Sequence, residues 1–255
     1  MSPALHRRTV LRGALLGWAL AVFPQAACTT GRSGDSPGPT SGSGTPKPSG
    51  IPSGPDSSTD ARPSEVAEGH ERSVRVLVAY FSRAGENYYY GDRVDLEVGN
   101  TEVLAGIISA HLTELGIKHD LHRIDAADRY PDDYDQTVAR NVREQDTGAR
   151  PKLANPLGSI DGYDVVLLGS PIWNVRPPML MLTFAEAHDF TGKLVHPFVT
   201  YAVSGLGTVE DDYTRACRGA DIGKGLAVRG ETVREDAPDA AADWLHRIEL
   251  RGQRP

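Results

Sequence analysis

The sequence is short of cysteine, of aromatic residues and of long apolar segments, and these shortages exclude several classes of protein. Two cysteines among 255 residues cannot build a disulfide framework or a zinc site with four thiolate ligands. The apolar run at residues 14–23 is too short to cross a bilayer as a helix. The net charge of −7 argues against a nucleic-acid backbone as the partner. What is left is an acidic globular protein with ordinary hydrophobic and charged content.

The first 27 residues have the pattern of an export signal. Arg7, Arg8 and Arg12 give a basic start without any acidic residue, and an apolar segment follows. The arginine pair with Leu11 after it resembles the twin-arginine motif, although paired arginines also occur in general secretory signals. The sequence therefore predicts an exported, extracytoplasmic protein, carried by the twin-arginine route or by general secretion.

Cys28 follows two alanines, as the modified cysteine of a lipoprotein does. Gln25 stands where that processing motif usually has leucine, so a soluble secreted protein cut after the alanines is the alternative. Glycine, serine and proline make up 23 of the 36 residues at 29–64. This segment therefore has too few large apolar side chains to offset the conformational entropy that folding would cost. We predict a lipid anchor at Cys28, and a disordered tether over residues 28–72 that links the anchor to a folded domain.

Residues 73–253 have the size and the patterning of one domain with its own core. Apolar runs predict strands, and longer periodic segments predict helices between them. The strands are expected at residues 74–80, 118–124, 163–169, 194–201 and 223–229, and the helices at residues 101–115, 134–144, 178–188, 209–218 and 237–250. This alternation predicts an α/β fold: a doubly wound, five-stranded parallel sheet with helices on both faces. Ligands of such sheets bind at the carboxyl ends of the strands.

The segments that follow three of these strands carry small, hydroxyl-bearing or aromatic residues. Residues 81–87 form a small hydroxyl-bearing turn, and residues 170–174 place Trp173 on a loop bent by proline. Residues 202–207 form a Gly/Ser loop, whose backbone could approach a flat ligand closely.

Six short motifs, taken in their order and spacing, resemble the flavodoxins, and specifically the short bacterial flavodoxin-like group that binds FMN. They lie at residues 79–83, 130–134, 169–173, 190–193, 204–207 and 227–230. The resemblance implies the strand order 2-1-3-4-5, an FMN cofactor and no catalytic side chain. No metal is expected, because His119 and His122 fall on opposite faces of a predicted strand. It implies that FMN is bound by Ser82, Arg83, Ala84, Gly85, Asn100, Thr101, Pro171, Ile172, Trp173, Asn174, Tyr201, Ser204, Gly205 and Gly207.

The first loop departs from the family pattern. An insertion, residues 86–99, separates Ser82 and its neighbours from Asn100 and Thr101, which are adjacent to that segment in the family. We expect the insertion to loop out, so that the Ser82 and Thr101 hydroxyls and the helix amides still hold the phosphate together. The alternative is that Ser82 only ends a strand and that Asn100 or Thr101 only caps a helix.

The resemblance places Trp173 over one face of the flavin, with Tyr201 or Val203 at the other face. A tryptophan packed in the core is the alternative for Trp173. Val203 and Asn174 replace residues that are usual in the family, which leaves the contacts near the reactive flavin nitrogen open. The tyrosines at 88–90 in the insertion are compatible with a lid, a docking patch or a locally packed loop.

These features lead to three hypotheses of function. The first is an electron carrier that docks with a redox partner protein, and the second is an FMN-dependent reductase of quinone-like small molecules. The third is a flavodoxin fold that has lost FMN and serves as a binding lipoprotein. Whether the protein is an enzyme is left open, no nucleic-acid partner is expected, and membrane contact is expected through the lipid anchor alone.

Overall fold

The computed structural model describes residues 73–248 and 250, so the predicted leader, Cys28 and the tether lie outside the described residues. Strand β1 (Arg75–Tyr80) pairs in parallel with β4 (Lys118–Arg123) and with β5 (Val165–Pro171). Strand β6 (Leu194–Tyr201) pairs in parallel with β5, which gives the order β4-β1-β5-β6-β7. The predicted parallel sheet and its 2-1-3-4-5 order are confirmed.

The last predicted strand is shorter than expected, and a separate short strand precedes it. Strands β7 (Asp221–Ile222) and β8 (Leu226–Arg229) both pair with β6, and residues 223–225 between them belong to neither strand. The Lys224 carbonyl there accepts hydrogen bonds from side chains, from the Trp244 indole at 3.0 Å and from His196 at 3.1 Å. The strand predicted at residues 223–229 is thus present as β8, but it begins at Leu226 rather than at residue 223.

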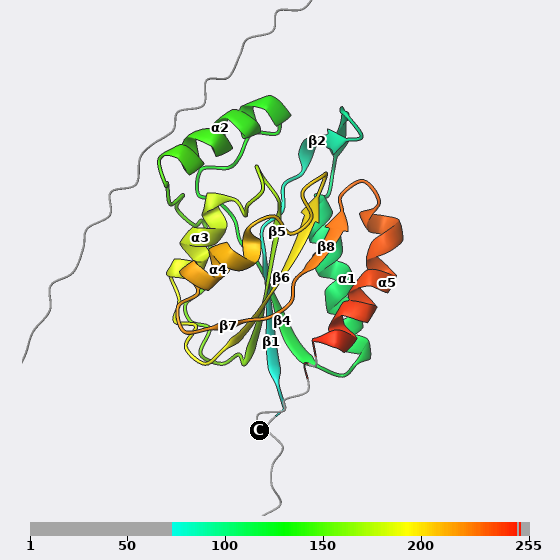
Figure 1. The fold of residues 1–255 in the computed structure, drawn as a ribbon, viewed down its shortest axis with the longest axis vertical. Coiled ribbons are helices and arrows are strands. Elements are labelled where there is room, and N and C mark those ends of the chain that lie inside the picture. The colour runs from blue at the N-terminus through cyan, green and yellow to red at the C-terminus, as the bar shows by residue number, and fades with distance from the viewer. Residues whose placement is uncertain (1–72, 249, 251–255) are drawn as a thin grey trace, which may run out of the picture. The chain divides into compact units, whose positions relative to one another are not determined.

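Helices cover both faces of the sheet (Figure 1). Helices α1 (Asn100–Glu114) and α5 (Val233–Arg247) pack together on one face, and α3 (Met179–Glu186) and α4 (Val209–Ala216) pack together on the other. Alternate residues of β1 enter the two cores, Val76 and Val78 on the α1 side and Leu77 and Ala79 on the α3 side. This is why β1 is apolar throughout.

Helix α5 begins four residues before the expected start at residue 237. The sequence prediction placed the start from the amphipathic pattern of residues 237–250. In the structure Pro238 lies inside the helix, and the amides of Glu235 and Asp236 bind the Thr232 carbonyl ahead of it. Within the described residues, no helix is long and apolar enough to cross a bilayer.

The insertion in the first loop forms an antiparallel hairpin of β2 (Gly85–Tyr89) and β3 (Asp92–Leu96), which the sequence prediction left without secondary structure. The hairpin lies at the carboxyl edge of the sheet, near α2 (Tyr134–Asp146) (Figure 1). The Glu86 amide donates to the Asp132 carbonyl at 2.8 Å, and the Arg93 guanidinium lies 3.7 Å from the centre of the Tyr134 ring. The inserted residues are thus attached to the domain along one side.

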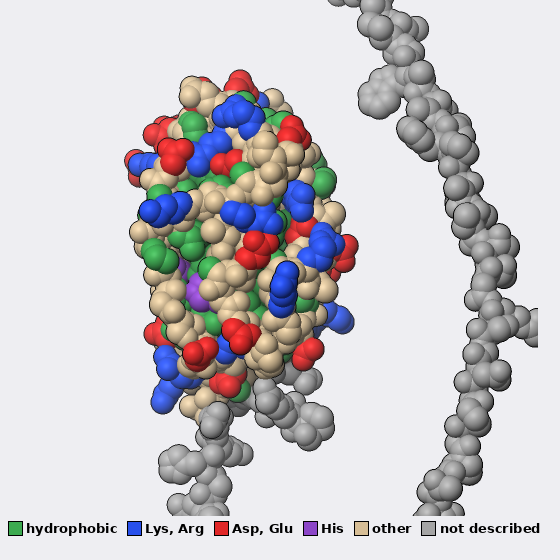
Figure 2. All heavy atoms as spheres, turned by 90° about the vertical axis from the view of Figure 1, so that its left-hand side faces the viewer, with side chains coloured by type: hydrophobic (Ala, Val, Ile, Leu, Met, Phe, Trp, Pro, Cys, Tyr) green, Lys and Arg blue, Asp and Glu red, His purple; other side chains and the backbone are tan. Residues whose placement is uncertain are grey.

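The face that carries α2, α3 and α4 mixes basic and acidic side chains rather than gathering one sign (Figure 2). Several of these charges are paired, for example Arg150 with Glu186 at 2.7 Å and Arg140 with Glu144 at 2.7 Å. Such a mixture does not mark a binding surface, and the topology points instead to the carboxyl edge of the sheet.

Two glycines give opposite predictions for stability. A Cβ on Gly169 in β5 would lie 2.1 Å from the ring of buried Phe198 on β6, whereas a Cβ on exposed Gly106 in α1 would meet nothing within 4 Å. We expect Gly169→Ala to lower the free energy of unfolding by about 1–3 kcal/mol through overpacking. Gly106→Ala should raise it by about 0.5–1 kcal/mol through helix propensity. Urea unfolding followed by circular dichroism measures both, and equal effects would contradict this packing.

Candidate functional site

A cleft opens at the carboxyl edge of the sheet, where the segments after β1, β5, β6 and β8 converge. Many of the residues predicted to bind FMN line it, namely Ser82, Arg83, Asn100, Thr101, Pro171, Ile172, Trp173 and Tyr201. The lining also contains residues that were not predicted as ligands, namely Asn87, Tyr88, Tyr134, Thr200, Ala202, Gly230 and Glu231. The other predicted residues, Ala84, Gly85, Asn174, Ser204, Gly205 and Gly207, are not part of the lining.

The two halves of the first loop meet across the base of the hairpin. The Ser82 hydroxyl accepts a hydrogen bond from the Glu102 amide at 3.0 Å. Gly99 precedes α1, and a Cβ at that position would lie 2.4 Å from both the Ser82 Oγ and the Arg83 carbonyl oxygen. Only glycine allows this approach, so the insertion leaves the start of α1 beside the end of β1.

The first turn of α1 presents unused hydrogen-bond donors. Among the described residues, the amides of Asn100 and Thr101 have no hydrogen-bond acceptor, as is normal for the first amides of a helix. The Ser82 hydroxyl accepts a bond and keeps its own proton to donate. The Thr101 and Thr200 hydroxyls are 2.7 Å apart, and only one of their two protons lies in that bond. These groups together can bind an anion, with the helix dipole in support.

Arg83 lines the cleft, but its guanidinium supports the neighbouring loop. Its Nη1 donates to the carbonyl oxygens of Pro131 at 3.0 Å and Asp132 at 2.9 Å, and its Nη2 donates to the Glu86 carbonyl. Burial lowers the pKa of Arg83, and the nearby acidic groups oppose that shift. The anion site therefore relies on amides and hydroxyls rather than on an arginine clamp.

Trp173 both lines the cleft and packs against buried aromatic residues. Its position is therefore compatible with contact to a ligand and with packing against the core at the same time. Its ring meets Phe81 edge-on at 5.5 Å between centroids and Tyr130 at 5.0 Å. The Tyr130 hydroxyl donates to Glu144 at 2.7 Å, and burial raises the pKa of this tyrosine strongly. The aromatic wall is therefore backed by the core rather than by solvent.

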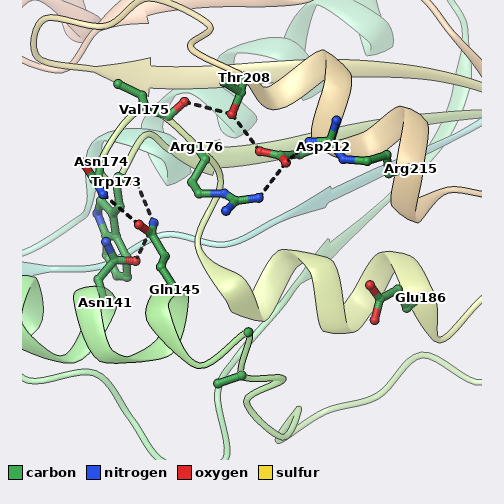
Figure 3. Close-up of polar contacts among 12 residues, drawn as sticks. Asn141, Gln145, Trp173, Asn174, Val175, Arg176, Glu186, Thr208, Asp212 and Arg215 are labelled. Carbon is green, nitrogen blue, oxygen red and sulfur yellow. Dashed lines mark hydrogen bonds and ion pairs between the residues drawn. The ribbon is translucent and has the colours of Figure 1, made fainter. Parts of the chain in front are cut away.

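Asn174 and Gly207 contribute to the turn that carries Trp173 and do not line the cleft. The Asn174 side chain donates to Gln145 on α2 at 2.9 Å (Figure 3). Gly207 has a φ of 54°, and a Cβ there would lie 2.0 Å from the Val175 carbonyl oxygen. Gly207 thus permits close contact between two loops, whereas a Cβ on Gly205 in the same loop would meet nothing within 4 Å.

Gly85 contacts the loop at residues 131–132 instead of lining the cleft. Gly85 has a φ of 84°, and a Cβ on it would lie 2.7 Å from the Asp132 carbonyl oxygen. Gly85 is thus needed where the hairpin passes close to the loop at residues 131–132.

Two of the unpredicted lining residues come from the hairpin, which the sequence prediction missed, and the others come from elements that were predicted or from the segments after them. Asn87 and Tyr88 come from the hairpin, and Tyr134 begins α2. Tyr88 and Tyr134 lie within segments already singled out, the tyrosine run and the 130–134 motif. Glu231 gave no signal in the sequence, and neither of its carboxylate oxygens has a partner among the described residues.

Comparisons with known proteins agree with this geometry. A family model described as flavodoxin matches residues 75–248. A provisionally assigned flavoprotein from Bacteroides eggerthii is 28% identical, with 68% of this chain and 97% of that chain covered and a TM-score of 0.53. Its counterpart from Bacteroides uniformis is 26% identical, with 69% and 99% covered and a TM-score of 0.51.

A flavoprotein from Lactobacillus acidophilus, solved in complex with FMN, is 16% identical, with 63% and 95% covered and a TM-score of 0.45. None of the curated proteins matches significantly. The family model covers well over half of the sequence, including β1, the cleft and α5. This chain belongs to the flavodoxin family.

Proposed function

We propose that this flavodoxin binds FMN in the cleft and acts as an electron carrier outside the cytoplasm. The observation that carries the proposal is the group of unused donors at the start of α1, the amides of Asn100 and Thr101 beside the Ser82 hydroxyl. They suit a phosphate, and the aromatic wall at Trp173 lies in the same cleft. Bound FMN would supply reversible electron transfer, and the protein would bind it and adjust its potential.

The residues of the cleft fit the two chemically different ends of FMN. Ser82, Asn100 and Thr101 would hold the phosphate, while Trp173 and Tyr201, from the ends of different strands, would flank the ring. The net charge of the chain is −7, which disfavours further negative charge on the ring and would lower its reduction potential.

Exposed apolar side chains near the cleft favour a partner protein. Val203 is 77% exposed and Val175 is 49% exposed, and both lie in loops that follow strands ending at the cleft. A redox partner docking there would cover apolar surface beside the flavin, and a basic partner would be attracted by the negative charge of the chain.

One observation favours a reductase of quinone-like molecules as the second candidate. Asn87 and Tyr88 of the hairpin line the cleft and add a side wall that a small substrate could contact. The third hypothesis, loss of FMN, rested partly on the divided first loop. That support is weaker now that Ser82 and the start of α1 are in contact.

The proposed location rests on the sequence of the leader. A signal over residues 1–27, a lipidated Cys28 and a tether over residues 28–72 would hold the domain beside the membrane. The twin-arginine route would fit a flavoprotein, because that route carries proteins that have already folded around a cofactor.

The first test distinguishes binding of the FMN phosphate from binding of the flavin ring. FMN and riboflavin titrations, followed by quenching of flavin fluorescence, give a Kd for each variant. Thr101→Ala should weaken FMN about tenfold and riboflavin little, because it affects the phosphate donors. Trp173→Ala should weaken both flavins about tenfold, because it removes ring contact. Tyr90→Ala, at the exposed hairpin tip, is the control with no effect. A folded wild-type protein that retains no FMN would overturn the proposal.

The second test separates a carrier from a reductase. For a carrier, the FMN-loaded protein should oxidise pyridine nucleotide with a quinone acceptor no faster than an equal amount of free FMN. Saturable turnover, with a KM that rises in Tyr88→Ala, would instead establish the reductase. The assay is steady-state absorbance at varied quinone concentration.

The third test concerns the anchor. Cys28→Ser should move the protein from the membrane fraction to the soluble extracytoplasmic fraction, because it removes the site of lipidation. Cys217→Ala is the matched control, since Cys217 is buried in the domain and its substitution should leave the protein in the membrane fraction. Cell fractionation with immunoblotting measures both, and a wild-type protein found only in the cytoplasm would contradict export.

A further inference from the structure

The turn from Trp173 to Arg176 has a backbone conformation that its own residues do not favour. Asn174 has a φ of 50° and Val175 a φ of 63°, and a β-branched residue rarely adopts the left-handed region. The turn is closed by two backbone hydrogen bonds between Trp173 and Arg176, of 2.9 Å and 3.4 Å. Contacts from elsewhere in the domain must therefore help to hold it.

Asp212 on α4 supplies such a contact (Figure 3). Its side chain is 1% exposed, and its Oδ1 lies 2.7 Å from Nη2 of Arg176, the last residue of the turn. Its Oδ2 accepts a hydrogen bond from the Thr208 hydroxyl at 2.8 Å. The Thr208 amide in turn donates to the Val175 carbonyl at 2.8 Å. Asp212 is thus connected to the turn by two routes.

Helix α2 holds the other side of the same turn. The Gln145 side chain donates to the Trp173 carbonyl at 3.0 Å and accepts from Asn174 at 2.9 Å (Figure 3). The indole of Trp173 therefore extends into the aromatic wall from a turn fixed by α2 and by α4.

We propose that Asp212 is a positioning residue of the flavin site. Through Arg176 and Thr208 it holds the turn in its unfavourable conformation, and so fixes Trp173 at the wall of the cleft. A displaced indole would change the contact with the ring, and with it the affinity for FMN and the reduction potential. This inference rests on the proposed function, because it assumes that FMN lies beside Trp173.

Asp212 has a second arginine partner, which provides a matched control. Arg215 contacts the same Oδ1 atom, but it lies on α4 three residues from Asp212 and is 65% exposed. Among the described residues, Asp212 is the only hydrogen-bond partner of the Arg176 side chain. Removal of either arginine takes one positive charge from the same carboxylate, yet only the loss of Arg176 releases the turn.

The experiment compares Arg176→Gln with Arg215→Gln in the full chain. We expect Arg176→Gln to weaken FMN about fivefold to tenfold, measured by flavin fluorescence, and to shift the midpoint potential measured by spectroelectrochemical titration. Arg215→Gln should stay within about twofold of wild type, with an unchanged potential. Arg176→Lys, which keeps the charge, should restore part of the affinity.

Hydrogen exchange in the protein without flavin gives a readout that does not depend on FMN. The Thr208 amide should exchange at least tenfold faster in Arg176→Gln than in Arg215→Gln, because its acceptor is the Val175 carbonyl. Equal exchange rates, or equal effects of the two variants on FMN affinity, would overturn the inference. If the wild-type protein binds no FMN while the two variants still differ in exchange, the proposed function and the flavin role of Asp212 are overturned. The effect of Asp212 on the turn would then stand.

Discussion

The hydrogen bond from the Glu102 amide to the Ser82 hydroxyl is the contact on which the rest of the cleft depends. It joins the end of β1 to the start of α1 across the whole insertion. It requires Gly99, because a side chain there would collide with both Ser82 and the Arg83 carbonyl. As a result the free amides of α1 lie at the carboxyl edge of the sheet, where the strands bring the aromatic wall.

The opposite wall is held by contacts that lie behind it. Trp173 is supported by Phe81 and Tyr130 at its ring and by side chains of α2 and α4 at its backbone. A wall fixed in this way loses little conformational freedom when a ligand binds, which favours affinity. The donors at the start of α1 need less support, because they are backbone amides of a helix.

The sequence predicted the sheet well because its strands are continuous apolar runs, as in β1 and β5, and short runs of this kind are typical of strands buried on both faces. It located the cleft because parallel strands end at one edge. It missed the hairpin, since residues 85–96 are mostly polar and have little apolar alternation. Gly207 was assigned to the ligand because a sequence shows that glycine is needed but not which neighbour approaches it. The role of Asp212 could not be predicted, since nothing in its sequence context indicates its two arginine partners.

The hairpin has a consequence for how this protein could diverge from its relatives. Its two ends are fixed next to Ser82 and Gly99, while its tip, with Tyr89 and Tyr90, is exposed. Natural selection can therefore change the length or the residues of the tip without displacing the amides of α1. Surface recognition and cofactor retention would then be inherited as separate traits.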